Sequence, residues 1–135
     1  MNIYLDIDGV LLANESNAAN YADEFLKAII EKYPESTYWL TTHNWKGENR
    51  AKEVLAPHLK PETVDLLDRV KPSEWKDLKT DAIDFDQDFL WFDDDLWPNE
   101  LNVLERHEAL QNFMMVDLQK DPDMLKKLAE VIEKS

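Results

Sequence analysis

Four short apolar runs along the chain predict buried β-strands. Each is rich in aromatic or β-branched residues, and each ends in polar or acidic residues. Their apolar positions are continuous rather than alternating, which is typical of parallel strands covered on both faces. The predicted strands span residues 2–7, 36–42, 88–95 and 112–118.

The segments between these runs carry apolar residues at helical spacing. Pro34 follows the first such segment, and Pro98 suits the first position of a later one. The pattern predicts helices over residues 19–33, 48–55, 74–84, 98–109 and 121–134. The stretch 62–70 is ambiguous and could form a helical turn that leads into a short additional strand.

Strands that alternate with helices indicate an α/β protein. We therefore expect a three-layer α/β/α, Rossmann-like sandwich around a mostly parallel sheet. The chain length suits a single domain over residues 1–135.

Composition narrows the possible functions. Acidic residues outnumber basic ones 29 to 15, a formal charge of −14 that argues against passive binding to nucleic acid. There is no cysteine, which excludes disulfides and thiolate metal sites. With two glycines, the chain has no glycine-rich phosphate loop. No membrane span or signal peptide is evident, so we expect a soluble, cytoplasmic protein without a membrane partner.

Three of the predicted strands end in residues that carry chemistry. The first ends at Asp6 and Asp8, the second at 41–44 (Thr-Thr-His-Asn), and the third at 93–95 (three aspartates). Carboxyl ends of parallel strands meet at one edge of a sheet, where ligands bind. Such a group of carboxylates requires a cation, and oxygen ligands with open water positions favour Mg²⁺.

A different metal site is conceivable around the third of these strand ends. Asp84, Asp86, Asp88 and Asp95 have the spacing of an EF-hand loop, but Phe89 occupies the position where the sharp turn requires glycine. We therefore favour the site at the sheet edge.

The sequence resembles the haloacid dehalogenase superfamily. The stretch "DIDGV" at 6–10 is similar to its first motif, "YWLTT" at 38–42 to its second, and "FLWFDDD" at 89–95 to its fourth. The third motif is a lysine upstream of the fourth, for which Lys71 and Lys79 are candidates. The motifs occur in the order and with the spacing of the family, and together they span most of the chain.

This resemblance implies a Mg²⁺-dependent phosphatase acting through an aspartyl-phosphate. Asp6 would be the nucleophile, and Asp8 the general acid and then the base. Mg²⁺ would bind Asp6, the backbone carbonyl of Asp8, and Asp94, with Asp93 binding through water or orienting Asp94.

Two further roles follow from the resemblance, each with two candidates. A threonine would bind the phosphoryl group, and we prefer Thr41 over Thr42 because Thr41 directly follows the apolar run. A lysine would neutralise charge. Lys71, followed by Pro72, is more similar to the usual family motif, but we favour Lys79 because it would open the helix just before the acidic strand.

The substrate is left open by these motifs. The intervals between motifs are just long enough for core elements, so we expect no cap domain and an open site. The resemblance then implies a phosphorylated small molecule, a nucleotide or a nucleic acid end as substrate. His43, Trp45 and Trp97 follow reactive strand ends and are candidates for substrate contacts.

Other functions are compatible with the same residues. One is a catalytically silent module that binds metal or phosphate, and another is a phosphotransferase that uses an acceptor other than water.

Overall fold

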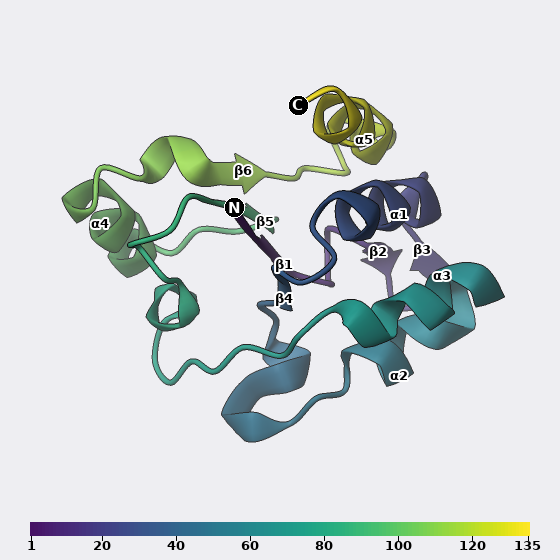
Figure 1. Ribbon diagram of the computed structural model, residues 1–135, viewed down its shortest axis with the longest axis horizontal. Coiled ribbons are helices and arrows are strands. Elements are labelled where there is room, and N and C mark those ends of the chain that lie inside the picture. The colour runs from purple at the N-terminus through teal and green to yellow at the C-terminus, as the bar shows by residue number, and fades with distance from the viewer.

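A central parallel sheet organises the molecule. The computed structural model describes residues 1–135, except for the side chain of Lys46. The sheet has four strands in the order β4-β1-β5-β6, and all neighbouring pairs are parallel (Figure 1). The strands are β1 (Asn2–Leu5), β4 (Thr37–Trp39), β5 (Phe89–Asp93) and β6 (Phe113–Met115). The predicted α/β class and all four predicted strands are confirmed, and each strand is shorter than predicted.

The register of the sheet brings the strand ends together. Leu5, the last residue of β1, is paired with Trp39 of β4 and with Phe92 of β5. The residues that follow β1, β4 and β5 therefore emerge side by side at one edge, as expected for a Rossmann-like sheet.

Successive residues of the central strands lie in two different buried clusters. Ile3, Leu5 and Phe92 belong to the first cluster, while Tyr4 and Trp91 belong to the second. Because neighbouring residues of a strand point to opposite faces, both faces of β1 and β5 are buried. This burial explains why their apolar runs are continuous.

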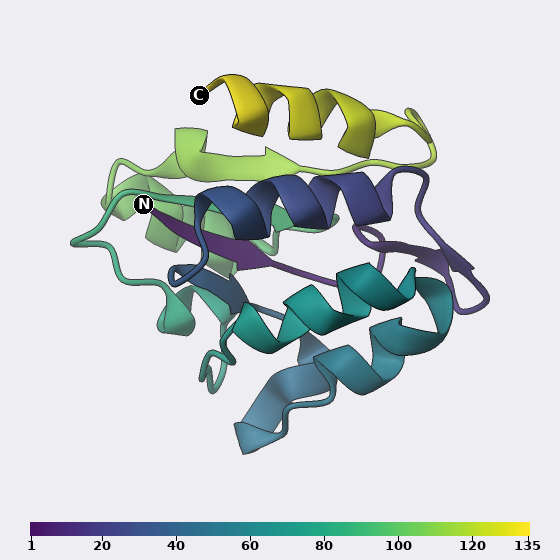
Figure 2. The same ribbon diagram turned by 45° about the vertical axis from the view of Figure 1, so that its right-hand side comes forward.

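The first cluster is covered by the two longest helices. These are α1 (Ala22–Lys32) and α5 (Met124–Lys134), which lie side by side in both ribbon views (Figure 2). Phe25 and Ile29 of α1 and Leu125 of α5 are fully buried in this cluster. The second cluster receives Leu104 from α4 (Pro98–Arg106), whose first residue is the proline predicted for that position.

The ambiguous stretch 62–70 is helical. It forms α3 (Pro61–Leu66) and the 3-10 turn η3 (Leu67–Arg69), after α2 (Ala51–Leu55) and η2 (Ala56–His58). The additional strand is reduced to one bridge between Tyr38 and Lys71, in which Lys71 N donates to Thr37 O at 3.0 Å.

The predicted helix over 74–84 is wrong. Only the 3-10 helix η4 (Lys79–Ala82) forms there. Asp81 Oδ2 accepts hydrogen bonds from the backbone N–H groups of Asp77 and Leu78, at 3.0 and 3.1 Å. Side-chain acceptors of this kind compete with helical hydrogen bonds, and here they hold an extended approach to Lys79.

A small hairpin after β1 was not predicted. It consists of β2 (Leu12–Asn14) and β3 (Asn17–Ala18), and Asn14 Oδ1 accepts from Ser16 N and Asn17 Nδ2 across the turn. The remaining elements are η1 (Thr42–Gly47) and η5 (Leu110–Asn112). Within the described part of the chain, every helix is too short or too polar to cross a lipid bilayer.

Candidate active site

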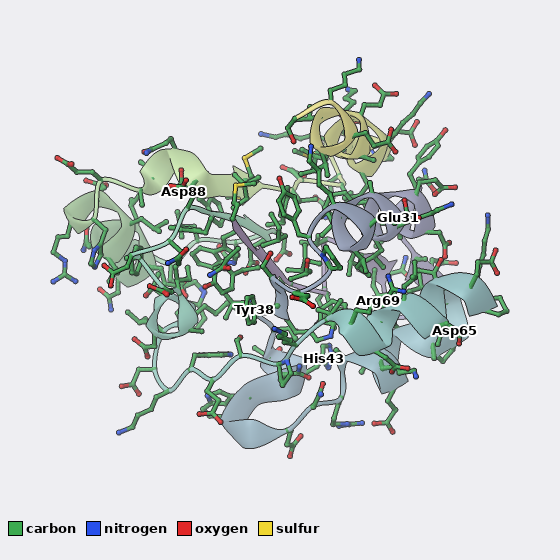
Figure 3. The ribbon with its side chains drawn as sticks, in the orientation of Figure 1. Glu31, Tyr38, His43, Asp65, Arg69 and Asp88 are labelled. Atoms are coloured by element: carbon green, nitrogen blue, oxygen red, sulfur yellow. The ribbon has the colours of Figure 1, made fainter. Side chains whose placement is uncertain are left out.

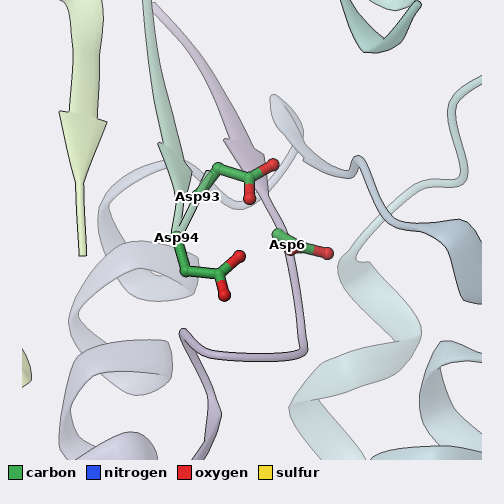
Figure 4. A group of neighbouring side chains, drawn as sticks. All are labelled: Asp6, Asp93 and Asp94. Atoms are coloured by element: carbon green, nitrogen blue, oxygen red, sulfur yellow. The ribbon is translucent and has the colours of Figure 1, made fainter. Parts of the chain in front are cut away.

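Three carboxylates meet at the edge where β1 and β5 end. Asp6 directly follows β1, Asp93 is the last residue of β5, and Asp94 follows it (Figure 4). One ligand oxygen from each lies within 4.8 Å of the others. The hydrogen bond from Asp6 N to Phe92 O, at 3.0 Å, continues the pairing beyond β1 and fixes Asp6 beside β5. The structure thus brings together Asp6, Asp93 and Asp94 as the motifs predicted.

A buried lysine compensates part of this negative charge. Lys79 Nζ lies 2.7 Å from Asp93 Oδ2 and 3.4 Å from Asp6 Oδ2. Its side chain is 14% exposed, so solvent screens the ion pairs weakly. The other candidate lies elsewhere: Lys71 Nζ donates to the carbonyl oxygen of Glu35 at 2.7 Å. Of the two lysines, only Lys79 joins the carboxylates.

Asp93 is held by neutral donors as well as by Lys79. The indole Nε1 of Trp91 donates to Asp93 Oδ2 at 3.2 Å, and the backbone N–H of Asp95 donates to Oδ1 at 3.3 Å. Trp91 and Asp93 are both buried, so solvent does not compete for this hydrogen bond. These contacts leave Asp93 with little capacity for other ligands and make it the fixed member of the group.

The charges of the group are only partly balanced. Burial, together with the negative charge of Asp6, raises the pKa of Asp93 to about 7. Burial and the neighbouring Asp93 raise the pKa of Asp94 to about 6. Burial also raises the pKa of Asp6, against the opposing effect of Lys79. One lysine therefore does not offset three carboxylates, and a bound cation would favour their charged forms.

Lys79 itself is held by a residue that the sequence analysis missed. Glu100 is 3% exposed, and its Oε2 accepts from Lys79 N at 3.0 Å while its Oε1 accepts from Trp97 N at 3.0 Å. The second bond caps the start of α4, since Glu100 is the third residue of that helix. A proline directly after Trp97 and a glutamate three residues after it form a recognisable signal for the start of a helix. The hydrogen bond between Glu100 and Lys79, in contrast, exists only in the folded chain.

Asp8 stands apart from the three clustered carboxylates. Its side chain is 64% exposed, and its Oδ2 lies 3.0 Å from Nε2 of His43. His43 is the second residue of η1, which begins three residues after the end of β4; Figure 3 labels His43. The contact therefore joins the ends of two neighbouring strands and orients the Asp8 carboxylate.

Gly9 is required at the turn that follows Asp8. Its φ is +78°, which disfavours residues with a side chain. A Cβ at this position would also lie 2.8 Å from the Cβ of Asp94 and overlap its carboxylate. The sequence indicated only the turn, whereas the structure adds this contact.

The two candidate threonines have different surroundings. Thr41 is fully buried, and its hydroxyl accepts from His43 N at 3.3 Å, which caps η1. Thr42 is exposed and lines a cavity beside Asp6 and Lys79. Thr41 thus supports the segment that carries His43, and Thr42, rather than the Thr41 preferred from the sequence, is the threonine that lines the smaller cavity.

Two cavities adjoin the site and share Asp8 and Asp94. The smaller, of about 180 Å³, is lined by the three clustered carboxylates, Lys79, Thr42, Trp75 and Trp97 among others. The larger, of about 640 Å³, extends from Asp8 and His43 between the β2–β3 hairpin and residues 116–119. The smaller cavity has the size for a phosphoryl group, and the larger one for a small molecule.

The EF-hand interpretation is excluded by the position of β5. Residues 89–93 form this strand, so Asp88 precedes it (Figure 3) while Asp95 follows its far end. Asp95 Oδ2 instead accepts from Trp97 Nε1 at 3.1 Å. Trp45 is not among the described residues that line the two cavities, and its ring centroid lies 6.0 Å from that of Trp75.

The fold and the site together define an α/β protein with a carboxylate–lysine centre at the carboxyl edge of a parallel sheet. The three clustered carboxylates, Asp6, Asp93 and Asp94, could hold a metal ion. A comparison with protein-family models, curated proteins and solved structures found no match.

Proposed function

We propose that the protein is a Mg²⁺-dependent phosphatase of the haloacid dehalogenase type, acting through an aspartyl-phosphate. The observation that carries this proposal is the arrangement around Asp6. This buried carboxylate shares Lys79 with Asp93 and lies beside Asp94, while Asp8, two residues later, lies at the junction of the two cavities.

The metal ligands in this proposal are Asp6, Asp94 and the backbone carbonyl of Asp8. Bound Mg²⁺ would offset the negative charge of the carboxylates and of the transferring phosphoryl group. Asp93 is already bound by Lys79, Trp91 and the backbone of Asp95, so its role is to fix Lys79 and orient Asp94.

Asp6 is the proposed nucleophile. One of its carboxylate oxygens attacks phosphorus, and the bond from phosphorus to the leaving oxygen breaks. Lys79, at 3.4 Å from Asp6 Oδ2, stabilises the charge that passes through the group. Thr42 lines the same cavity and would contact a phosphoryl oxygen, while buried Thr41 holds the segment that carries His43 in place.

Asp8 is the proposed proton carrier. It gives a proton to the leaving oxygen, and it then takes one from the water that attacks the aspartyl-phosphate and releases Asp6. Its exposure suits this exchange of protons with solvent, and the contact with His43 holds it at the cavity. A phosphorylated small molecule, a nucleotide or a nucleic acid end would each supply a phosphomonoester for this chemistry.

The finer description of the fold belongs to the same proposal. Helices on both faces of the sheet would make it a three-layer sandwich without a cap domain, so that both cavities open to solvent. The proposed setting is the cytoplasm, where Mg²⁺ and phosphorylated metabolites are available.

The test is Mg²⁺-dependent hydrolysis of p-nitrophenyl phosphate by the pure protein. Asp6→Asn keeps the shape of the side chain but removes the nucleophile, and we expect a loss of at least about 10³-fold in kcat. Circular dichroism of the variant controls for folding. Mg²⁺ binding without turnover would identify a silent module instead, and transfer of phosphate to added alcohols would identify a phosphotransferase.

A further inference from the structure

In the proposed mechanism, the leaving group of the substrate would lie in the larger cavity. Asp8 lines both cavities, and as general acid it must contact the oxygen that leaves phosphorus. With the phosphoryl group in the smaller cavity, the rest of the substrate therefore extends past Asp8 into the larger one. Its volume of about 640 Å³ lies in the range for small-molecule sites.

The walls of this cavity carry negative charge beyond the catalytic residues. Glu15 lies in the turn of the β2–β3 hairpin, and Asp117 follows β6 on the opposite side. Asp117 Oδ1 accepts from the backbone N–H groups of Gln119 and Lys120, both at 3.2 Å. No described side chain forms an ion pair with either carboxylate.

Positive charge is scarce around both cavities. Among the described residues that line them, Lys79 is the one lysine or arginine, and it is already paired with Asp6 and Asp93. His43 contacts Asp8. A nucleic acid end would place further phosphates here with no cation to neutralise them, and the formal charge of −14 would repel the strand as a whole.

We propose that the substrate is a small phosphomonoester whose leaving group carries an amine. The ammonium would form a charge-assisted hydrogen bond with the carboxylate of Glu15 or Asp117, both of which line the larger cavity. Asn14 and Gln119, which also line the cavity, would bind neutral polar groups of the same molecule. This inference rests on the proposed phosphatase function.

A matched pair of substrates tests the inference. O-phosphoethanolamine and 2-hydroxyethyl phosphate have nearly the same size, but only the first has an ammonium group. We expect kcat/KM to be about three- to tenfold higher for the amine, the range for one or two partly exposed charge pairs. Oligonucleotides with a 3′- or 5′-phosphate should be the poorest substrates, and p-nitrophenyl phosphate is the general reference.

Two substitutions then locate the selectivity. Glu15→Gln with Asp117→Asn removes both charges, and the Asn side chain still offers an oxygen to Gln119 N and Lys120 N. We expect this double variant to reduce the ratio of kcat/KM between the two esters toward one. The control is Glu31→Gln with Asp65→Asn, which removes two exposed charges away from the cavities and should leave the ratio as it is (Figure 3).

The outcomes separate the two proposals. Hydrolysis of p-nitrophenyl phosphate with a preference for oligonucleotide ends, or equal rates on the matched esters, would overturn the substrate class and leave the phosphatase intact. No hydrolysis of any ester with Mg²⁺ present would overturn the phosphatase and the substrate class together.

Discussion

The α-carbon of Gly9 faces the side chain of Asp94 so closely that a Cβ on Gly9 would lie 2.8 Å from the Cβ of Asp94. The turn after the first motif and the acidic end of β5 are thus packed against each other. The position of the Asp94 carboxylate therefore depends on a contact between two segments that lie far apart in the sequence.

Replacing Gly9 by alanine should therefore weaken metal binding. The new Cβ forces Asp94 away from Asp6, and we expect the dissociation constant for Mg²⁺ to rise about tenfold, as estimated from one lost charge-assisted contact. Isothermal titration calorimetry measures this constant directly.

Gly47→Ala is the matched control for that experiment. Gly47 also has a positive φ, +83°, but nothing lies within 4 Å of a Cβ built on it. Both variants should lose about 1 kcal/mol or more of stability from backbone strain. An equal effect of both on Mg²⁺ affinity would contradict the role of the Gly9–Asp94 contact.

Lys79→Met should destabilise the protein at neutral pH. Methionine keeps much of the length of lysine but leaves Asp6 and Asp93 buried without their cation, which costs about 3–5 kcal/mol for a buried pair. Urea denaturation with EDTA present measures this loss. Hydrolysis of p-nitrophenyl phosphate should be lost in the same variant. The control Lys71→Met should retain hydrolysis, because Lys71 Nζ donates to the carbonyl oxygen of Glu35 and not to the carboxylates of the site.

The stability of the metal-free protein should fall as pH rises through the acidic range. The pKa of Asp93 is raised to about 7 and that of Asp94 to about 6, from an ordinary value of 3.8. Between about pH 4 and pH 7 the folded state binds more protons than the unfolded state. The contribution of these two carboxyls to the free energy of unfolding is therefore present below about pH 4 and is lost by about pH 7. The thermal midpoint in EDTA should show a smaller decline in Asp93→Asn than in the wild type.

Addition of Mg²⁺ should stabilise the protein more at pH 8 than at pH 5.5. Protons compete with the metal for Asp94, whose pKa is raised to about 6, so Mg²⁺ stabilises the protein less when that carboxyl is protonated. Differential scanning fluorimetry with and without Mg²⁺ at both pH values checks this. An equal increase in the thermal midpoint at the two pH values would place the metal at other ligands.

Glu100→Gln should lower activity while leaving Mg²⁺ affinity nearly unchanged. The two carboxylate oxygens of Glu100 accept hydrogen bonds from Lys79 N and Trp97 N, and glutamine replaces one of these oxygens by an amide donor. We expect this change to displace Lys79 but not the metal ligands. We expect a loss of about tenfold in kcat from a small misplacement of Lys79. An equal loss in a remote control, Asp65→Asn, would show that the effect is not specific.

The elements that the sequence predicted best are those with a strong local signal. The strands that lead to Asp6 and Asp93 are continuous apolar runs closed by acids, and burial on both faces explains why these runs are continuous. The helix predicted over 74–84 failed because the Asp81 side chain binds the backbone locally. The hairpin over 12–18 was missed because its strands are too short to show a pattern.

For the candidate site, the sequence by itself determined which carboxylates follow which strands, and parallel pairing then required Asp6, Asp93 and Asp94 to meet. Only the tertiary structure decided that Lys79 rather than Lys71 joins them, that Glu100 holds Lys79, and that Asp8 turns to His43. The reason is physical: strand ends are aligned by the regular geometry of the sheet, whereas side chains from loops and helix ends reach a site through contacts between residues far apart in the sequence.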